Sequence, residues 1–216
     1  MSDGTSRGDR ISDKGGKYHH GDLRDSLIHA ALELVETQGV GGLSLRAAAR
    51  RAGVSHAAPY RHFKDKEALL AAAAEQGYRE LGNYLQGKLD KLGEGKVERV
   101  QGLAQAYVEF ARQNTPQFRL MFGPSIPDKT IYPELQKASG DAFRLVMQAT
   151  KEAYEAGDLT GPSYQQVGMS AWALTHGIAS LYVDRQFVSA GMSGDDAESA
   201  IEWMFAIFLA GAATEK

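Results

Sequence analysis

The stretch LSLRAAARRAGVSHAAPYRHFKDKE, residues 43–67, decides the fold of this 216-residue chain. Ser44 stands where a hydroxyl can cap a helix, and a short apolar face follows over residues 45–52. Gly53 ends that helix, and Ser55 can cap a second one. Because only three residues separate the two helices, the stretch has the tight link that a DNA-reading helix pair requires. It predicts a helix-turn-helix.

The second helix of the pair, expected over residues 56–63, has the composition of a surface that approaches DNA. Small side chains at Ala57 and Ala58 would let its backbone lie close to a groove, and hydrogen-bonding side chains follow them. Pro59 lies within its first turn, where it removes one N–H donor. The side chains predicted to face the major groove are Ser55, His56, Ala57, Tyr60 and Arg61, with His62 beside them.

Four segments give the chain a resemblance to the tetracycline-repressor (TetR) family of bacterial transcription regulators. They are ETQG (36–39), LSLRAAARRAGVS (43–55), YRHF (60–63) and DKEALL (65–70). The resemblance covers residues 18–70. It implies an N-terminal DNA-binding domain, a C-terminal effector domain, and repression as the usual sign of regulation.

Three further residues are predicted to hold the DNA backbone, namely Ser44, Arg46 and Lys66. Asp65 stands at the cap of a third helix, so Lys66 falls in the first turn of that helix. There it can meet a phosphate beside the positive end of the helix. The resemblance also implies a phosphate-contacting lysine at this position.

Composition and charge fit a DNA-binding module joined to a different domain. The chain has 43% hydrophobic residues and no cysteine, which excludes disulfide scaffolds, thiolate metal sites and thiol catalysis. Residues 1–67 hold 11 Lys or Arg against 9 Asp or Glu, whereas the rest of the chain holds 13 against 18. A slightly basic N-terminal third on an acidic body is typical of such an arrangement.

The N-terminal segment shows neither a signal peptide nor a metal site. Residues 1–20 are polar and lack an apolar core, so we expect a cytoplasmic protein. Residues 1–17 predict a disordered arm, which either follows DNA phosphates or has no role. His19 and His20 are adjacent and would point apart in an extended segment. Residues 159–183 carry no Asp, Glu, Lys or Arg but are too polar for a membrane span.

The remainder of the chain predicts helices only, so we expect an all-α fold. From Lys66 the helical pattern continues for about 25 residues, or roughly 40 Å, which is long enough to link two domains. We expect a helix-turn-helix domain over residues 18–65 and a helical effector-binding and dimerisation domain over residues 66–216. Further helices are expected over residues 97–114, 115–122, 134–156, 163–187 and 195–213.

The last helix is apolar on two opposite sides. Phe205 and Phe208 belong to one stripe, and Trp203, Ile207 and Ala210 form another. Both stripes must be covered. The last two helices could pair with their copies across a two-fold axis, giving a homodimer with a four-helix interface, as the resemblance also implies. The alternative is the central helix of a monomeric bundle.

Aromatic and methionine side chains of the body predict a pocket for a small, mainly apolar effector. WALTHG (172–177), together with FRLMFG (118–123), is similar to a subset of TetR-family regulators with a tryptophan, histidine, glycine signature. The alternative is a plain core that contains a hydrogen-bonded His176. The predicted effector contacts are Tyr107, Phe110, Met121, Phe122, Phe143, Met147, Trp172 and His176.

Three classes of function compete. A ligand-responsive regulator would bind both halves of a near-palindromic double-stranded operator and leave it when an effector shifts the linking helix. A constitutive DNA-binding dimer would differ only in lacking an effector. An enzyme has no support, because the chain contains no HExxH pair, no GxSxG elbow and no phosphate-binding glycine loop, and no cofactor is predicted. The sequence favours the regulator.

Overall fold

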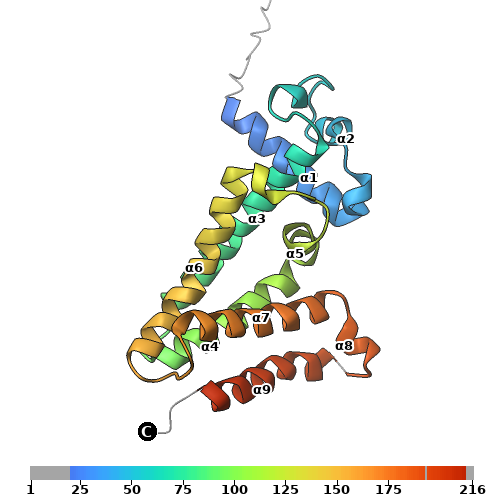
Figure 1. Ribbon diagram of the computed structural model, residues 1–216. Coiled ribbons are helices and arrows are strands. Elements are labelled where there is room, and N and C mark those ends of the chain that lie inside the picture. The colour runs from blue at the N-terminus through green and yellow to red at the C-terminus, as the bar shows by residue number, and fades with distance from the viewer. Residues whose placement is uncertain (1–19, 193, 213–216) are drawn as a thin grey trace, which may run out of the picture.

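The computed structural model describes residues 20–192 and 194–212, and the regular elements in this part of the chain are all helices. The predicted all-α fold is therefore confirmed (Figure 1). The predicted arm, residues 1–17, and His19 lie outside the described residues. In chain order the elements are α1 (His20–Gly42), α2 (Leu45–Arg51), the 3-10 helix η1 (Pro59–Arg61), α3 (Lys66–Leu89), α4 (Lys96–Gln113), α5 (Thr115–Phe122), the 3-10 helix η2 (Lys129–Ile131), α6 (Pro133–Glu155), α7 (Tyr164–Val183), α8 (Gln186–Ser189) and α9 (Gly194–Ala212).

The helices α1 and α2 form a small N-terminal unit with the start of α3. Ser44 caps α2, because its Oγ accepts a hydrogen bond from the Ala47 amide at 3.1 Å. Asp65 caps α3 by accepting one from the Ala68 amide at 2.8 Å. Phe63 is 4% exposed and belongs to the core of this unit. The caps at Ser44 and Asp65 are thus confirmed, and they fix where the two helices begin.

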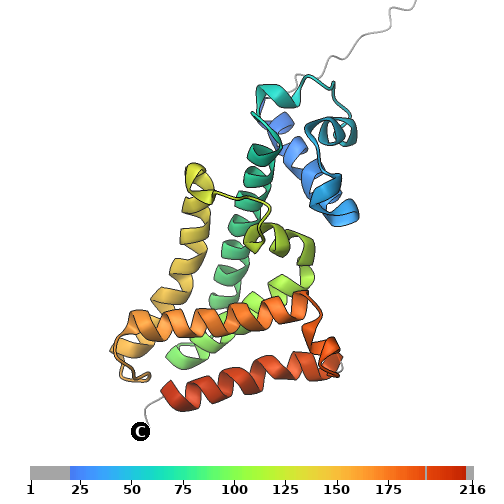
Figure 2. The ribbon, with the colours of Figure 1, turned by 45° about the vertical axis from the view of Figure 1, so that its right-hand side comes forward.

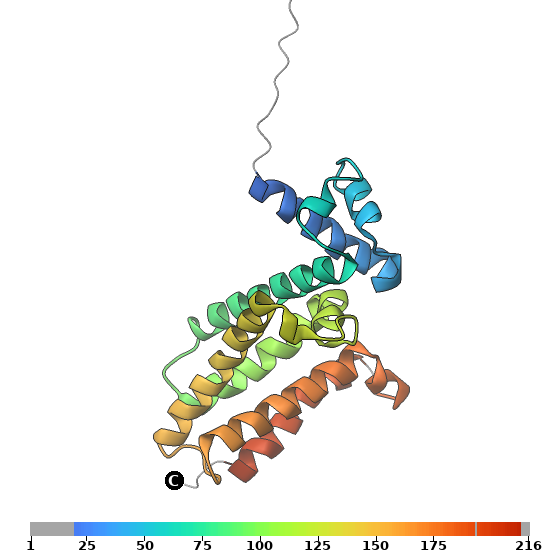
Figure 3. The same cartoon turned by 45° about the horizontal axis from the view of Figure 1, so that its top comes forward.

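The helix α3 connects this unit to the rest of the molecule. Its 24 residues start directly after Asp65 and run into the body, where α6 lies alongside (Figures 1 and 3). The side chains of α3 that face the core include Leu69, Leu70, Leu81, Leu85 and Leu89. The helix α3 is thus a continuous connection between the N-terminal unit and the body.

The helices α7 and α9 lie side by side at the end of the molecule farthest from α2 (Figures 1 and 2). The helix α9 contacts α4 and α7, and Phe205 on its inner side is 1% exposed. On its outer side, Trp203 and Ile207 are 47% and 66% exposed. This division matches the two predicted stripes for Phe205, Trp203 and Ile207. None of the helices in the described part of the chain has the length and hydropathy that a bilayer span needs.

Candidate nucleic-acid interface and ligand cavity

The turn after α2 is sharp, as predicted. The prediction of an α-helix over residues 56–63 is wrong. Gly53 has a φ of +69°, a left-handed conformation that favours glycine. The Ala58 amide then donates to the Ser55 carbonyl, and the Arg61 amide donates to the Ala58 carbonyl, both three residues back. Pro59 explains the difference, because it has no N–H and its ring clashes with the carbonyl four residues back. The run forms a turn followed by η1.

The predicted groove-facing residues share an exposed surface at the outer end of the N-terminal unit (Figure 1). This surface, which we call the reading surface, consists of Ser55, His56, Ala57, Tyr60 and Arg61. Pro59 and Phe63 are buried beneath it and anchor the turn. His62 is half-buried, and its ring centroid lies 6.5 Å from that of Phe63. Ser44 and Arg46 are exposed at the start of α2.

Two further cations belong with the reading surface and were not singled out from the sequence. Arg50 at the end of α2 and Lys64 just before the Asp65 cap are both exposed. The sequence signal that could have identified them is their position in the same short basic segment as Arg46 and Arg61. Together with Arg46 and Arg61 they give this end of the molecule the positive charge that phosphates attract.

The side chain of Lys66 is not freely exposed, although its predicted role in contacting a DNA phosphate would suggest that it is. It is half-buried, and its Nζ donates a hydrogen bond to the Val40 carbonyl oxygen at 2.8 Å. That bond joins the first turn of α3 to the last turn of α1. Lys66 therefore helps to hold the N-terminal unit together.

A cavity of about 450 Å³ lies in the body between α3, α4, α5, α6 and α7. Four predicted effector contacts line it, namely Tyr107, Phe122, Phe143 and Trp172. Sequence reasoning missed its α3 wall, formed by Tyr78, Leu81 and Leu85, and its α6 and α7 residues Ser139, Gly140, Ala142, Val146 and Met169. We call this space the effector cavity, after the ligand that the sequence predicts for it.

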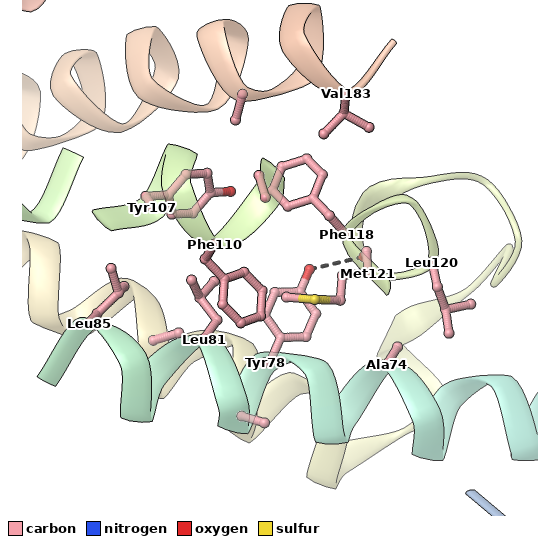
Figure 4. Close-up of a cluster of buried hydrophobic side chains, with 14 of the residues drawn as sticks. Ala74, Tyr78, Leu81, Leu85, Tyr107, Phe110, Phe118, Leu120, Met121 and Val183 are labelled. Carbon is pink, nitrogen blue, oxygen red and sulfur yellow. Dashed lines mark hydrogen bonds between the residues drawn. The ribbon is translucent and has the colours of Figure 1, made fainter. Parts of the chain in front are cut away.

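The other four predicted contacts do not line the effector cavity. Phe110 on α4 and Met121 on α5 are 3% and 0% exposed and belong to the core between α3, α4 and α5 (Figure 4). Met147 packs against Gly168, because a Cβ added to that glycine would come 2.8 Å from the methionine sulfur. His176 faces a second cavity. For Phe110, Met121 and Met147 the aromatic and methionine pattern therefore marks packing, whereas His176 lines a different cavity.

The polar groups of the effector cavity already have partners inside the protein. Tyr78 Oη donates to the Met121 carbonyl at 3.0 Å, as the dashed line in Figure 4 shows, and Tyr107 Oη lies 2.9 Å from His176 Nδ1. Burial raises the pKa of both tyrosines, so both hydroxyls stay protonated. Ser139 Oγ donates to the Gln136 carbonyl. No charged side chain lines this cavity, which therefore suits a neutral, mainly apolar molecule.

Two family profiles match the chain, one in its N-terminal third and one in its C-terminal part. The profile described as "Bacterial regulatory proteins, tetR family" matches residues 27–73, and "Tetracyclin repressor-like, C-terminal domain" matches residues 100–208, half of the chain. The chain belongs to the TetR family. This is a family of DNA-binding, helix-turn-helix transcription regulators and not of enzymes.

Individual relatives agree with the TetR assignment. The chain is 50% identical to the class C tetracycline repressor protein of Escherichia coli over 52 residues, which is 24% of each chain. It is 29% identical to an HTH-type transcriptional regulator of Mycobacterium tuberculosis over 145 residues, 65% of this chain and 61% of that protein. The matches thus span less than two thirds of either relative.

Solved structures resemble the TetR chain over nearly its whole length. A Rhodococcus protein of unknown function is 35% identical, with a TM-score of 0.78 over 92% of this chain and 99% of that one. A TetR family transcription regulator from Marinobacter aquaeolei, 18% identical, has a TM-score of 0.66 over 89% and 96% of the two chains. The second comparison shows the shared fold alone.

Lys66→Met is expected to destabilise this TetR-family protein, because the Val40 carbonyl loses a charged hydrogen-bond donor. We expect the free energy of unfolding to fall by about 1.5 to 3 kcal/mol in urea titrations. Lys64→Met is the matched control, since Lys64 is exposed and its loss should leave stability unchanged. Equal stability of the two variants would contradict a structural role for Lys66.

His176 predicts a pH dependence of stability. Burial lowers its pKa below the usual value of 6.5, so the folded protein keeps it neutral where the unfolded chain protonates it. Stability is unaffected by this group above pH 6.5 and falls as the pH drops through that value. The slope is at most about 1.4 kcal/mol per pH unit.

The His176→Phe variant should therefore lose stability less steeply than the unsubstituted protein between about pH 7 and about pH 5 in urea titrations. His29→Asn serves as the control, because His29 is exposed on α1. An identical slope in His176→Phe and the unsubstituted protein would rule out His176 as the source.

Proposed function

We propose that this protein is a transcriptional repressor that binds a near-palindromic operator as a homodimer and leaves it when a small, neutral, mainly apolar effector binds. The observation that carries the proposal is the path of α3. Its first turn belongs to the N-terminal unit that carries the reading surface, and Tyr78, Leu81 and Leu85 farther along the same helix line the effector cavity. One rigid element thus joins both sites.

DNA contact is assigned to the unit that we delimit as residues 18–65, with residues 66–216 as the effector-binding and dimerisation domain. The exposed reading surface would enter the major groove, with Arg61 the side chain best suited to guanine and Ala57 permitting close approach. Ser44, Arg46 and Lys66 would position the DNA backbone. For Lys66 this requires its Nζ to share or leave the Val40 carbonyl on binding.

Dimerisation is assigned to the outer faces of α7 and α9. Apolar side chains are exposed there in the single chain, with Leu181 40%, Trp203 47% and Ile207 66% accessible. Small exposed residues, Ala173 on α7 and Ala206 on α9, would let two copies of the helices approach closely. Such a two-fold interface fixes the separation of the two reading surfaces, as operator half-sites require.

Effector binding would act by changing the position of α3. A molecule in the cavity presses on one face of α3 and on α6 opposite it, and the N-terminal unit moves with the helix. A coupling of about 1 to 3 kcal/mol would lower operator affinity by a factor of about 5 to 150. The presence of a cavity of this size supports an effector over the constitutive alternative.

The test measures binding of the protein to a fluorescent DNA fragment from immediately upstream of its own gene. Fluorescence anisotropy gives the affinity at several salt concentrations. We expect binding that weakens steeply with salt and is reversed by the neutral aromatic probe 1-naphthol. Gly140→Phe, which fills the cavity at a position where a Cβ meets only Arg144 at 3.8 Å, should abolish the naphthol response. Absence of any DNA binding at low salt would refute the proposal.

A further inference from the structure

A second cavity, of about 420 Å³, lies between the N-terminal unit and the body. Its wall includes Val40 at the end of α1, Arg119 and Phe122 of α5, and His176 and Ser180 of α7. The effector cavity is lined entirely by residues of the body, whereas the wall of this second cavity includes Val40 of the N-terminal unit beside residues of the body. Its shape therefore depends on how the N-terminal unit sits against the body.

A thin aromatic wall separates the two cavities. Phe122 lines both, Tyr107 and Trp172 line the effector cavity, and His176 lines the second cavity. The Trp172 and His176 rings are stacked at 5.4 Å between centroids with an interplanar angle of 9°, and the Phe122 and His176 centroids are 4.6 Å apart. The two spaces are thus distinct but share a wall one ring thick.

The hydrogen bonds of His176 determine what it offers to the second cavity. The protonated Tyr107 hydroxyl can donate to the imidazole Nδ1, 2.9 Å away, and in that arrangement the neutral ring carries its proton on Nε2. Ser180 Oγ lies 3.5 Å from that Nε2, a long contact that leaves room for a better acceptor. The cavity therefore presents an imidazole N–H and a serine hydroxyl to any occupant.

The charged groups at the rim of the second cavity neutralise each other. The Arg119 guanidinium donates to the Val183 carbonyl at 2.6 Å and lies 3.2 Å from the Asp184 carboxylate. An anionic ligand would compete with Asp184 for Arg119, and a cationic ligand would compete with Arg119 for Asp184. A neutral molecule avoids both costs.

We propose that the second cavity is a separate ligand site for a neutral molecule with an apolar body and a carbonyl oxygen, which accepts the His176 Nε2–H and the Ser180 hydroxyl. An occupant there touches Val40, whose carbonyl already accepts from Lys66 Nζ and from the Leu43 amide. Because the site is built from both sides of the junction, its ligand favours one arrangement of the N-terminal unit over others. The binding step does not depend on the proposed function.

The experiment titrates three probes of similar size, acetophenone, benzoate and benzylamine, into the full-length protein without DNA, with saturation-transfer NMR as the readout. Acetophenone should bind at least about tenfold more tightly than either charged probe. Ser180→Phe, which fills the second cavity, should weaken acetophenone at least about tenfold, whereas Gly140→Phe, which fills the effector cavity, should not. His176→Phe should weaken it about fivefold or more.

Loss of acetophenone binding in Gly140→Phe alone would overturn the proposal, because the probe would then occupy the effector cavity. Equal binding by all variants, or no binding, would overturn it as well. Circular dichroism shows whether Ser180→Phe folds. If it does not fold, nuclear Overhauser effects from the acetophenone methyl to Ser180 and His176 protons in the unsubstituted protein decide whether acetophenone occupies the second cavity.

Hydrogen exchange at the Leu43 amide should slow on binding, and unchanged exchange would refute the link to α1.

Discussion

Replacing Ala57 with glutamate is expected to weaken operator binding by about a hundredfold or more while leaving the protein folded. Ala57 is exposed on the turn between Ser55 and Pro59, so a longer side chain costs no packing inside the protein. On DNA, however, the carboxylate would face phosphates and bases at the position of closest backbone approach. Its repulsion and loss of water are the reason for the large effect.

Ala156→Glu is the matched control for this substitution. Ala156 is an exposed alanine at the C-cap of α6, and its replacement changes the net charge by the same amount. Anisotropy titrations of both variants at one salt concentration separate a local clash from a general charge effect. Operator affinities of Ala57→Glu and Ala156→Glu that agree within twofold would exclude the reading surface as the DNA contact.

The helix boundaries of the N-terminal unit could be predicted from sequence because their signals are local. A cap needs only one polar side chain and an amide three residues later, as at Ser44 and Asp65. The left-handed turn needs only Gly53. The difference over residues 56–63 has a local cause as well, because Pro59 lacks an N–H and begins the 3-10 helix η1 where an α-helix was expected.

The effector cavity could be predicted only in part, because periodicity cannot distinguish a residue that fills space from one that borders an empty space. Phe110 and Phe143 both fit an inward-facing helical pattern, yet Phe110 is core and Phe143 lines the cavity. The difference depends on how far apart α3, α4 and α6 lie, which is set by contacts distant in sequence. Tyr78 on α3 was missed because the pattern of that helix predicts a link between domains and does not indicate a cavity beside it.

Replacing Ile207 with glutamate is expected to convert the proposed dimer into a monomer at micromolar concentrations. Among the α9 side chains that the structure describes, Ile207 is the most exposed large apolar one, and Trp203 lies one turn before it on the same face. A two-fold axis places the substitution in the interface twice, so two carboxylates lose water together. An unpaired buried charge costs several kcal/mol, which is enough to dissociate a dimer of moderate affinity. Sedimentation velocity measures the mass directly.

Ile131→Glu is the control, because Ile131 is 61% exposed in η2, remote from α7 and α9, and its substitution should leave the dimer intact. DNA binding then tests whether the interface acts through geometry alone. The Ile207→Glu monomer keeps its reading surface, so it should bind a single half-site as well as the unsubstituted protein does. Its affinity for the complete operator should fall to the half-site value, because the second half-site no longer benefits from a linked partner. A monomer that kept full operator affinity would contradict the dimeric arrangement.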